Sequence, residues 1–305
     1  MEQVSAVVVS FNRLDKLKNV IASIEAQTRK PDRLIIIDNA STDGTGAFLE
    51  SVESPLTIEA VSLPENIGGA GGFSAGMARA YARGADFVWI MDDDCYPAND
   101  ALELLLGGYD DAVSALGPEV PFACSLVQFT DGSICEMNNP ETTWDWARLI
   151  AKGSRLVMVR SCSFVSVLFP RWVLEKHGLP YSEYFIWFDD HEYTLRVTGT
   201  CPGVQVLDSA VVHDMGENKG VNFGLIDRKN AWKFKYGIRN EASFRLHHQS
   251  LASFLIFCAR VQLGMHKGRV AMGLRGSMTR ELLRGIGFNP KVRFPEQSAG
   301  ASAGT

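Results

Sequence analysis

Residues 87–94 read Phe-Val-Trp-Ile-Met-Asp-Asp-Asp, an apolar run that stops at three consecutive acids. The run is typical of a buried strand, so the carboxylates of Asp92, Asp93 and Asp94 emerge together where the strand ends. Unpaired carboxylates at the edge of a core are costly, and a divalent cation would offset that cost. Two acids spaced Asp-x-Asp can share one Mg²⁺ or Mn²⁺ ion with phosphate oxygens. The stretch predicts metal-assisted binding of a diphosphate, and the alternative is a solvated turn at a strand end.

Short apolar runs and amphipathic segments alternate on both sides of this strand. The expected strands are 4–10, 34–37, 57–63 and 86–91, and the expected helices are 14–27, 43–53, 73–83 and 97–106. This alternation predicts an α/β fold, with a parallel sheet covered by helices on both faces. Weaker patterns predict strands near 122–129, 157–168 and 205–212 and a helix over 189–197.

Length and composition limit the class of protein. The chain has 305 residues, of which 46% are apolar, enough for one large domain with appendages or two modest ones. Its six cysteines form no Cys-x-x-Cys pair, which argues against a zinc cage or a disulfide framework and favours a reduced cytosolic compartment. The start of the chain shows no signal-peptide pattern. The apolar run 251–259 is far shorter than the about 20 residues that cross a bilayer.

Charge divides the chain into an acidic body and a basic C-terminal region. Residues 228–293 contain 14 Lys and Arg but two acids, a net charge of +12, whereas residues 1–227 carry 16 bases and 32 acids, or −16. The basic region therefore either meets an anionic partner or packs on the acidic body. We expect a catalytic domain over 1–225, a basic helical region over 226–297 and a disordered tail over 298–305.

Polar clusters stand at the ends of four expected strands. They are Asn12-Arg13, Asp38-Asn39, Asp92–Asp94 and His213-Asp214. Ligands of open α/β sheets bind outside the carboxyl ends of the strands, so the four clusters predict one binding cleft. Asp38 is expected either to contact a base or ribose or to act as a turn residue. His213 is expected to bind the metal, with a purely structural histidine as the alternative.

Two further segments suggest parts of the site. Residues 66–73, Asn-Ile-Gly-Gly-Ala-Gly-Gly-Phe, are neither a Walker loop nor a dinucleotide fingerprint. Their glycines would let the backbone approach a ligand closely and expose amide donors, unless they form a plain flexible loop. In residues 187–196, acids stand beside aromatic residues. Asp190 there is the candidate general base, because an apolar wall raises a carboxyl pKa, while the alternative is a helix start with capping acids.

These motifs, in this order, resemble glycosyltransferase family 2. The order runs through Val-Val-Val-Ser-Phe-Asn at 7–12, Ile-Asp-Asn at 37–39, the Asp-x-Asp, Asp-Asp-x-Glu at 189–192 and then His213. The glycine-rich stretch, the acid triplet, residues 188–196 and Tyr-Gly-Ile-Arg-Asn at 236–240 are similar to bacterial galactofuranosyltransferases of the mycobacterial type. The resemblance covers about residues 4–245, but residues 110–160 show no family pattern.

The resemblance implies a GT-A fold, which is Rossmann-like with a mostly parallel sheet, plus a C-terminal helical extension. It implies that Asp92, Asp94 and His213 hold Mn²⁺ or Mg²⁺ and that Asp190 is the base. It also implies that Asp93 contacts the donor and Asp38 the uridine. Trp187, and Trp144 or Trp146, are expected to stack on sugar faces. The full set of residues expected to bind the donor is Phe11, Arg13, Asp38, Asn66, Gly68, Gly69, Gly71, Gly72, Asp93, Trp187 and Asp189.

The expected function is an inverting, metal-dependent transfer of galactofuranose from UDP-galactofuranose to a lipid-linked or polysaccharide acceptor in cell-envelope glycan synthesis. The basic helices would hold the protein on the anionic inner face of the plasma membrane, and no nucleic-acid partner is expected. Two alternatives stay open. One is a rhamnosyltransferase that uses dTDP-rhamnose, and the other is a non-catalytic protein that binds a nucleotide sugar.

Overall fold

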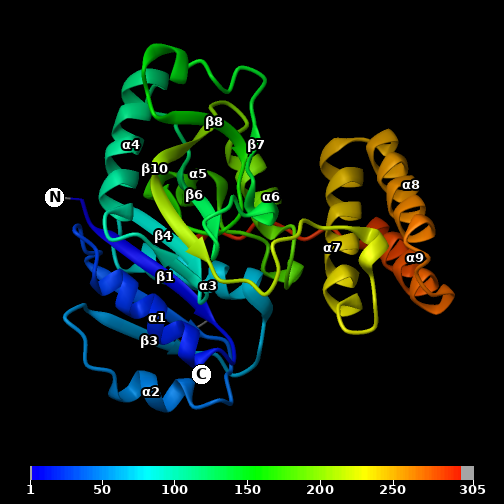
Figure 1. The fold of residues 1–305 in the computed structure, drawn as a ribbon, viewed down its shortest axis with the longest axis horizontal. Helices are drawn as coiled ribbons and strands as arrows, with labels where there is room; N and C mark the ends of the chain where they lie inside the picture. The colour runs from blue at the N-terminus through cyan, green and yellow to red at the C-terminus, as the bar shows by residue number, and fades with distance from the viewer. Residues whose placement is uncertain (1, 297–305) are drawn as a thin grey trace.

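A computed structural model describes residues 2–296, which form a sheet-centred body and a group of C-terminal helices beside it (Figure 1). The strands are β1 (Val4–Ser10), β2 (Arg33–Asp38), β3 (Ile58–Ser62), β4 (Phe87–Asp92), β5 (Cys95–Pro97), β6 (Ala123–Phe129), β7 (Glu141–Thr142), β8 (Leu156–Ser161), β9 (Val167–Pro170) and β10 (Gly203–His213). The helices are α1 (Leu14–Glu25), α2 (Thr45–Ser51), α3 (Gly68–Ala82), α4 (Ala101–Leu116), α5 (Arg171–His177), α6 (Asp189–Val197), α7 (Ala231–Phe244), α8 (Leu251–Lys267) and α9 (Met272–Gly287). The tail expected over 298–305 lies outside the described residues.

The sheet is mixed rather than mostly parallel. Its order is β3-β2-β1-β4-β9-β6-β10-β8-β7, with β5 paired to β10. The first four strands in this order are parallel, as expected, but β9 runs antiparallel to β4 and β6, and β8 runs antiparallel to β10. The strand expected near 157–168 is therefore two strands, β8 and β9, which are not neighbours in the sheet. A continuous apolar run also looks the same in either direction, so the sequence did not predict their orientation.

Helices cover both faces of the sheet and bury two separate cores. On one face, Val4, Ala6 and Val8 of β1 pack in a cluster with α1 and α4. On the other face, Val7 and Val9 pack in a cluster with α3, α5 and α6. Every residue of β1 is buried, as expected of a central strand with helices on both sides. This sandwich fixes the strand ends that form the site.

The glycine-rich stretch is the start of α3, not a loop. Its glycines bring this helix close to the sheet: a Cβ built on Gly72 would lie 2.5 Å from Cγ1 of Val9, and one on Gly76 would lie 2.3 Å from Cγ1 of Val7. The expected helix 73–83 therefore begins five residues earlier, at Gly68. Packing on β1 thus accounts for Gly72, whereas Gly68 lies against the backbone of Phe185, Gly71 lies against the side chain of Ile67, and a Cβ on Gly69 would meet nothing within 4 Å.

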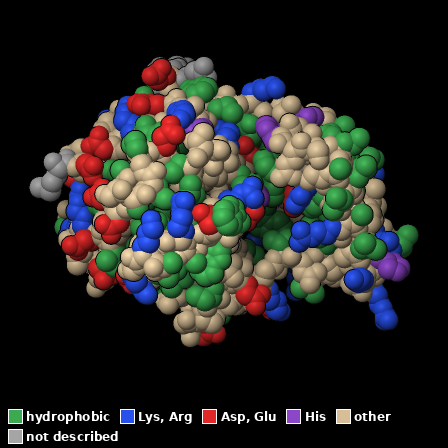
Figure 2. Space-filling view, turned by 90° about the horizontal axis from the view of Figure 1, so that it is seen from above, with side chains coloured by type: hydrophobic (Ala, Val, Ile, Leu, Met, Phe, Trp, Pro, Cys, Tyr) green, Lys and Arg blue, Asp and Glu red, His purple; other side chains and the backbone are tan. Residues whose placement is uncertain are grey.

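Helices α7, α8 and α9 form a lobe with its own apolar core, which includes Phe234, Phe257 and Met278. The chain after α9 returns to the body, where Leu179 N donates to the carbonyl of Arg293 at 2.9 Å. Figure 2 shows acidic side chains gathered over the body and basic and apolar ones over the lobe. Among residues 2–296, no helix is both long and apolar enough to cross a lipid bilayer.

We predict that Gly76→Ala destabilises the protein even though alanine favours helix. The added methyl would meet the stiff side chain of Val7 in a packed core, which should cost about 1–3 kcal/mol in the free energy of unfolding. Gly107 of α4 is the matched control, because it is exposed and a Cβ there meets nothing within 4 Å. Gly107→Ala should stabilise by up to about 1 kcal/mol. Denaturant unfolding measures both, and equal effects of the same sign would contradict the packing argument.

Candidate functional site

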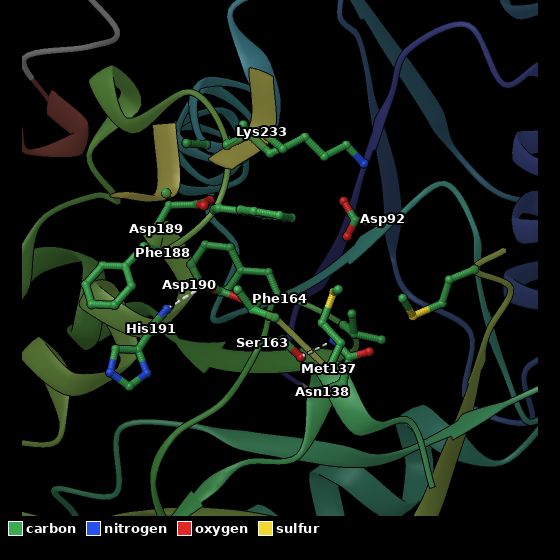
Figure 3. Close-up of a pocket in the computed structure, with 18 of the residues that line it drawn as sticks. Asp92, Met137, Asn138, Ser163, Phe164, Phe188, Asp189, Asp190, His191 and Lys233 are labelled. Atoms are coloured by element: carbon green, nitrogen blue, oxygen red, sulfur yellow. Dashed lines mark hydrogen bonds between the residues drawn. The ribbon is translucent and has the colours of Figure 1, made fainter. Parts of the chain in front are cut away.

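A pocket of about 710 Å³ lies where the carboxyl ends of the strands face helix α7. Residues from the start of α3, the end of β4, the start of α6, the end of β10 and α7 line it. Asp92, Asp94, Asp190 and His213 all belong to its wall. Figure 3 shows Asp92 and the pair Asp189–Asp190 entering the pocket from different elements. The predicted convergence of distant acids and an imidazole in one pocket is therefore present in the structure.

The short strand β5 brings His213 to the acids. Strands β4 and β10 are not neighbours, because β9 and β6 lie between them. However, β5 follows Asp94 directly and pairs antiparallel with the end of β10, with Cys95 opposite His213. The N–H of Asp214 also donates to the carbonyl of Asp94 at 2.8 Å. As a result Nε2 of His213 lies 3.2 Å from Oδ1 of Asp94.

Asp92, Asp94, Cys95 and His213 each offer one ligand atom, and these atoms lie within 4.8 Å of one another. Burial and the charge of Asp94 raise the pKa of Asp92 to about 8. Burial also disfavours ionised Asp94, but His213 and Arg13 outweigh it and lower that pKa. Burial raises the pKa of the Cys95 thiol well above its usual value, and a soft thiolate does not suit Mn²⁺ or Mg²⁺. Two carboxylates and one imidazole remain, a set that fits Mn²⁺ or Mg²⁺.

The hydrogen bonds of His213 test this fit. Its Nδ1 lies 2.8 Å from Oδ1 of Asn138, an acceptor, so Nδ1 carries a proton. In the neutral ring, the bare Nε2 then faces Oδ1 of Asp94, which is buried and has no hydrogen-bond partner among residues 2–296. A lone pair that faces a carboxylate oxygen is repulsive, and either a proton on Nε2 or a cation bound by both atoms would relieve the repulsion. The residues present therefore fit a metal ion, and Asn138 orients the imidazole for it.

Side chains already occupy part of the acid triplet. Asp93 accepts hydrogen bonds from Ser10 Oγ at 2.9 Å and from Arg13 Nη1 at 3.2 Å, and it holds the end of β1. Arg13 also pairs with Asp94, and Lys16 Nζ lies 3.7 Å from the same carboxylate. Asp93 and Asp94 therefore already have hydrogen-bond and ion-pair partners, which their sequence does not indicate. Arg13 and Lys16 both line the pocket, where they present positive charge beside the candidate metal ligands.

Asp189 and Asp190 begin helix α6 inside the pocket. Burial raises the pKa of Asp190 to about 6, and burial together with Asp190 raises that of Asp189 further. Oδ1 of Asp190 accepts a hydrogen bond from the N–H of His191 at 2.7 Å, so the capping role and a place in the pocket coexist. A carboxyl group with a pKa near 6 in a partly apolar pocket suits a general base.

The segment that leads into these acids is held in an unusual backbone conformation. Phe185, Trp187 and Phe188 have φ angles of 66°, 65° and 74°, which are sterically disfavoured for such side chains. Asn240 of α7 is fully buried, and its Nδ2 donates to the carbonyls of Tyr184 and Trp187, each at 2.9 Å. The helical lobe therefore fixes the geometry of the segment that presents the candidate base.

The residues expected to bind the donor divide into two groups. Arg13, Gly69, Trp187 and Asp189 line the pocket, whereas Phe11, Asp38, Asn66, Gly68, Gly71, Gly72 and Asp93 lie outside its lining. Asp38 accepts from Ser41 N at 3.0 Å, the turn contact of its alternative interpretation, and Asn66 accepts from Gly68 N at 2.8 Å. Donor contacts by the second group stay predictions.

Sequence reasoning missed several pocket residues. Lys233 of α7 extends towards Asp92 (Figure 3), and burial and Arg13 lower its pKa. Its only signal in the sequence was membership of the basic region. Asn138 lies in the segment 110–160, which carried no pattern. Their places in the pocket depend on tertiary contacts.

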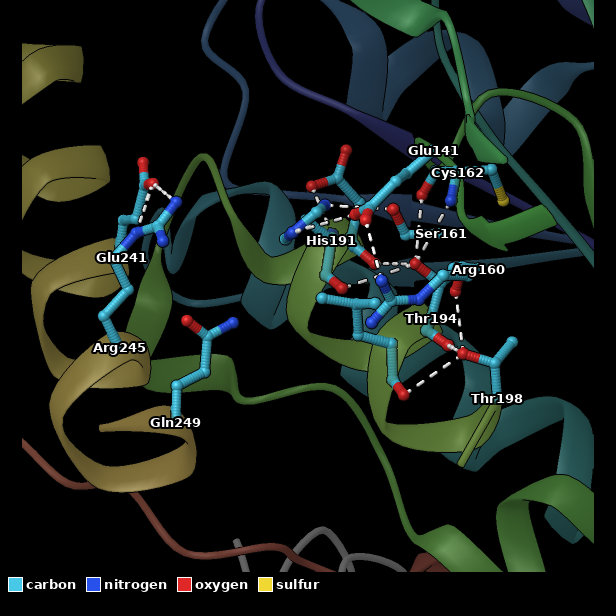
Figure 4. A network of polar contacts seen from close by, with 12 residues as sticks. Glu141, Arg160, Ser161, Cys162, His191, Thr194, Thr198, Glu241, Arg245 and Gln249 are labelled. Atoms are coloured by element: carbon cyan, nitrogen blue, oxygen red, sulfur yellow. Dashed lines mark hydrogen bonds and ion pairs between the residues drawn. The ribbon is translucent and has the colours of Figure 1, made fainter. Parts of the chain in front are cut away.

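A second polar network surrounds His191, the residue after Asp190 (Figure 4). Ser161 Oγ lies 3.0 Å from Nδ1 of His191, and Nε2 of His191 lies 4.0 Å from Glu141. Across the pocket, Glu241 of α7 pairs with Arg245 at 2.6 Å. Both networks offer hydrogen-bonding groups near the candidate base, as the hydroxyl groups of a bound saccharide would require.

Comparison with known proteins agrees with this geometry. Residues 5–125 match the model of the family described as Glycosyl transferase family 2. The chain is 31% identical over 231 residues to galactofuranosyltransferase GlfT1 of Mycobacterium tuberculosis, an alignment that covers 72% of each chain. It is 36% identical over 127 residues to GlfT1 of Mycolicibacterium smegmatis, covering 41% of this chain and 40% of the relative.

Solved structures show the same fold at low sequence identity. The crystal structure of S. aureus TarS 1-349 has a TM-score of 0.62 at 16% identity, over 93% of this chain and 81% of that chain. The structure of GalNAc-T7 with UDP, GalNAc and Mn²⁺ has a TM-score of 0.60 at 12% identity, over 99% of this chain and 57% of that chain. The chain therefore belongs to glycosyltransferase family 2 and is a glycosyltransferase with a GT-A fold.

Proposed function

We propose that the protein transfers galactofuranose, with inversion, from UDP-galactofuranose to a lipid-linked or polysaccharide acceptor of the cell envelope. The proposal is supported by the similarity to a galactofuranosyltransferase over 72% of the chain. The observation that carries it is the meeting of Asp92, Asp94, His213 and Asp190 in one pocket. A cation site and a separate carboxylate base are the two parts that a direct displacement at an anomeric carbon requires.

In this mechanism Asp190 removes the proton from an acceptor hydroxyl as its oxygen bonds to the anomeric carbon. The bond from that carbon to the UDP oxygen breaks on the opposite face, and UDP leaves with the electron pair. A metal ion, when bound by Asp92, Asp94 and His213, supplies positive charge for the diphosphate. Arg13, Lys16 and Lys233 add further positive charge at the same end of the pocket. Trp187 would pack against the donor sugar.

A donor panel with a base variant tests the proposal. The wild-type protein should transfer sugar from UDP-galactofuranose, detected by mass spectrometry, whereas Asp190→Asn should bind UDP normally but lose about 10²–10⁴-fold in kcat. The wild-type rate should fall as pH drops through about 6, because protonated Asp190 cannot accept the hydroxyl proton. Near-normal turnover by the variant would remove Asp190 as the base.

The same panel separates the alternatives. Transfer from dTDP-rhamnose but not from UDP-galactofuranose would make the protein a rhamnosyltransferase. Donor binding by calorimetry without single-turnover transfer to any polyprenyl-diphosphate saccharide would indicate a nucleotide-sugar-binding protein.

The metal site gives a second prediction. Asp94→Ala should abolish Mn²⁺-dependent UDP binding measured by calorimetry, because it removes a buried ligand. Asn138→Leu keeps every ligand but removes the acceptor that orients His213, and it should weaken Mn²⁺ affinity about 10–100-fold. Unfolding curves control for loss of the fold. Unchanged Mn²⁺ affinity in both variants would contradict the proposed site.

We further infer that the helical lobe docks on the anionic inner face of the plasma membrane, which would make this a cytoplasmic, peripheral protein. Helices α8 and α9 expose large apolar side chains, including Ile256 at 68% and Met272 at 76% of their accessible area. These side chains lie in the region whose net charge is +12. Exposed apolar groups among Lys and Arg are typical of helices that lie in a membrane interface. Such docking would bring the pocket to a lipid-linked acceptor.

Charge reversal tests the docking. Changing Arg269, Arg275 and Arg280 to Glu should reduce binding to vesicles of anionic phospholipid on the order of 100-fold, since each cation near the surface contributes about 1 kcal/mol. Reversing three basic residues of the body, Lys18, Lys30 and Arg155, changes the net charge equally and should have a much smaller effect. Equal losses in the two triple variants would show non-specific charge attraction rather than a docking face.

A further inference from the structure

A hollow outside the pocket contains two exposed tryptophans. It lies at the β7 edge of the sheet, and Trp144, Trp146, Arg148, Arg160 and Pro202 line it. Trp144 is 95% exposed and Trp146 is 45% exposed. Side chains of this size rarely stay in water without a use, because burying them is strongly favourable. The two rings expected to stack on sugars therefore do not enter the pocket but form a surface of their own.

The backbone holds this surface in place. The N–H of Thr143 donates to the carbonyl of Met158 at 3.1 Å, and the N–H of Met158 donates to the carbonyl of Trp146 at 3.2 Å. Thr143 Oγ1 also donates to Oδ1 of Asp145 at 2.9 Å. These bonds tie the tryptophan segment to strand β8, so the exposed rings belong to an ordered surface.

The charges of the hollow are balanced. Arg148 lies 3.5 Å from the carboxylate of Asp145, and Arg160 lies 3.2 Å from that of Glu141. Each cation thus has its own acid, unlike the acid-poor region of α8 and α9. A phosphate or an anionic lipid surface would find no net positive charge here. Aromatic faces beside paired charges instead suit a neutral ligand with many hydroxyl groups, which needs flat apolar contact and hydrogen bonds of both kinds.

The hollow is connected to the catalytic pocket. Glu141 is bonded to Arg160 of the hollow, and its other oxygen lies 4.0 Å from Nε2 of His191, which lines the pocket beside Asp190. Figure 4 shows Glu141, Arg160 and His191 in one group. Arg160 and Ser161 are adjacent in β8, and Ser161 belongs to the pocket wall. Glu141, Arg160 and His191 thus form a wall between the hollow and the pocket, which an acceptor that occupies both places would have to cross.

We propose that this hollow is a saccharide-binding subsite, in which Trp144 and Trp146 stack on neutral sugar rings of the acceptor, distant from the hydroxyl that reacts at Asp190. The proposal rests on the proposed function, because it takes the acceptor to be a glycan. The subsite makes the enzyme favour acceptors long enough to span both places. Its ligand class is a neutral oligosaccharide.

The experiment compares acceptors of different lengths. Alkyl glycosides of one, two and four galactofuranose units are assayed with the wild-type protein, Trp144→Ala, Trp144→Phe and Trp232→Ala. Trp144→Ala should raise KM for the longest acceptor about 5- to 10-fold, the loss of one stacked ring, with KM for the shortest within twofold. Trp144→Phe should recover most of the loss. Trp232 is a matched control, since it is 46% exposed on α7 and lies outside the hollow and the pocket lining.

Binding without turnover separates failure of the subsite from failure of the proposed function. Saturation-transfer NMR with the four-unit glycoside and no donor should give a signal that Trp144→Ala reduces and Trp232→Ala does not. Normal transfer with the same length dependence in Trp144→Ala and wild type would overturn the subsite alone. Absence of transfer by the wild type, with NMR contact intact, would overturn the proposed function alone. Loss of anionic-vesicle binding in Trp144→Ala, without loss of saccharide contact, would make the hollow a membrane contact and refute the proposal.

Discussion

The antiparallel pairing of β5 with the end of β10 is the contact on which the site depends. It places His213 opposite Cys95, and therefore beside Asp94, although two strands separate β4 from β10 in the sheet. Strand β10 can do this because it shifts register between Val206 and Ala210, and it pairs with β8 before the shift and with β5 after it. A bulge of this kind re-aims the end of a strand. Three residues of strand thus join the two halves of the body around one candidate cation site.

The helical lobe is part of the site rather than an appendage. Asn240 of α7 holds the segment with positive φ angles that precedes Asp189 and Asp190, and Arg239 donates to the carbonyl of Glu183 in the same segment at 2.9 Å. Lys233 reaches towards Asp92 from the same helix. Strained backbone persists only where its surroundings over-determine it. The proposed orientation of the base therefore depends on packing between body and lobe. The boundary expected near residue 225 would separate the core of the lobe from the two cores of the body, but not two functions.

The features that could be predicted from the sequence are those that leave a local sequence pattern. Strand runs and the acids that end them are local patterns, so β1, β2 and β4 were predicted within a residue or two of their bounds. The direction of β8 and β9 was not, because a buried run reads alike both ways. The glycines before Phe73 suggested a ligand loop, since sequence does not show that Gly72 packs on Val9 or that Gly68 packs on the backbone of Phe185. Asn138 is hydrogen-bonded to His213, which is 75 positions away in the sequence, so no local pattern could identify it.

Burial acts on both ends of the pocket, with different results. It raises the pKa of Asp190 to about 6, and no cation among residues 2–296 forms an ion pair with this carboxyl group, so the group can accept protons near neutral pH. Burial, with the negative charge of Asp94 added to it, raises the pKa of Asp92 to about 8, so positive charge beside the pair favours its ionised form. Arg13, Lys16 and Lys233 provide part of it, and Nε2 of His213 lies 3.2 Å from Oδ1 of Asp94, close enough for both atoms to bind one cation. The same low-dielectric surroundings thus favour a proton acceptor at Asp190 and cation binding at Asp92 and Asp94. The proposed displacement needs both, because a hydroxyl group loses a proton at one end of the pocket and a diphosphate leaves at the other.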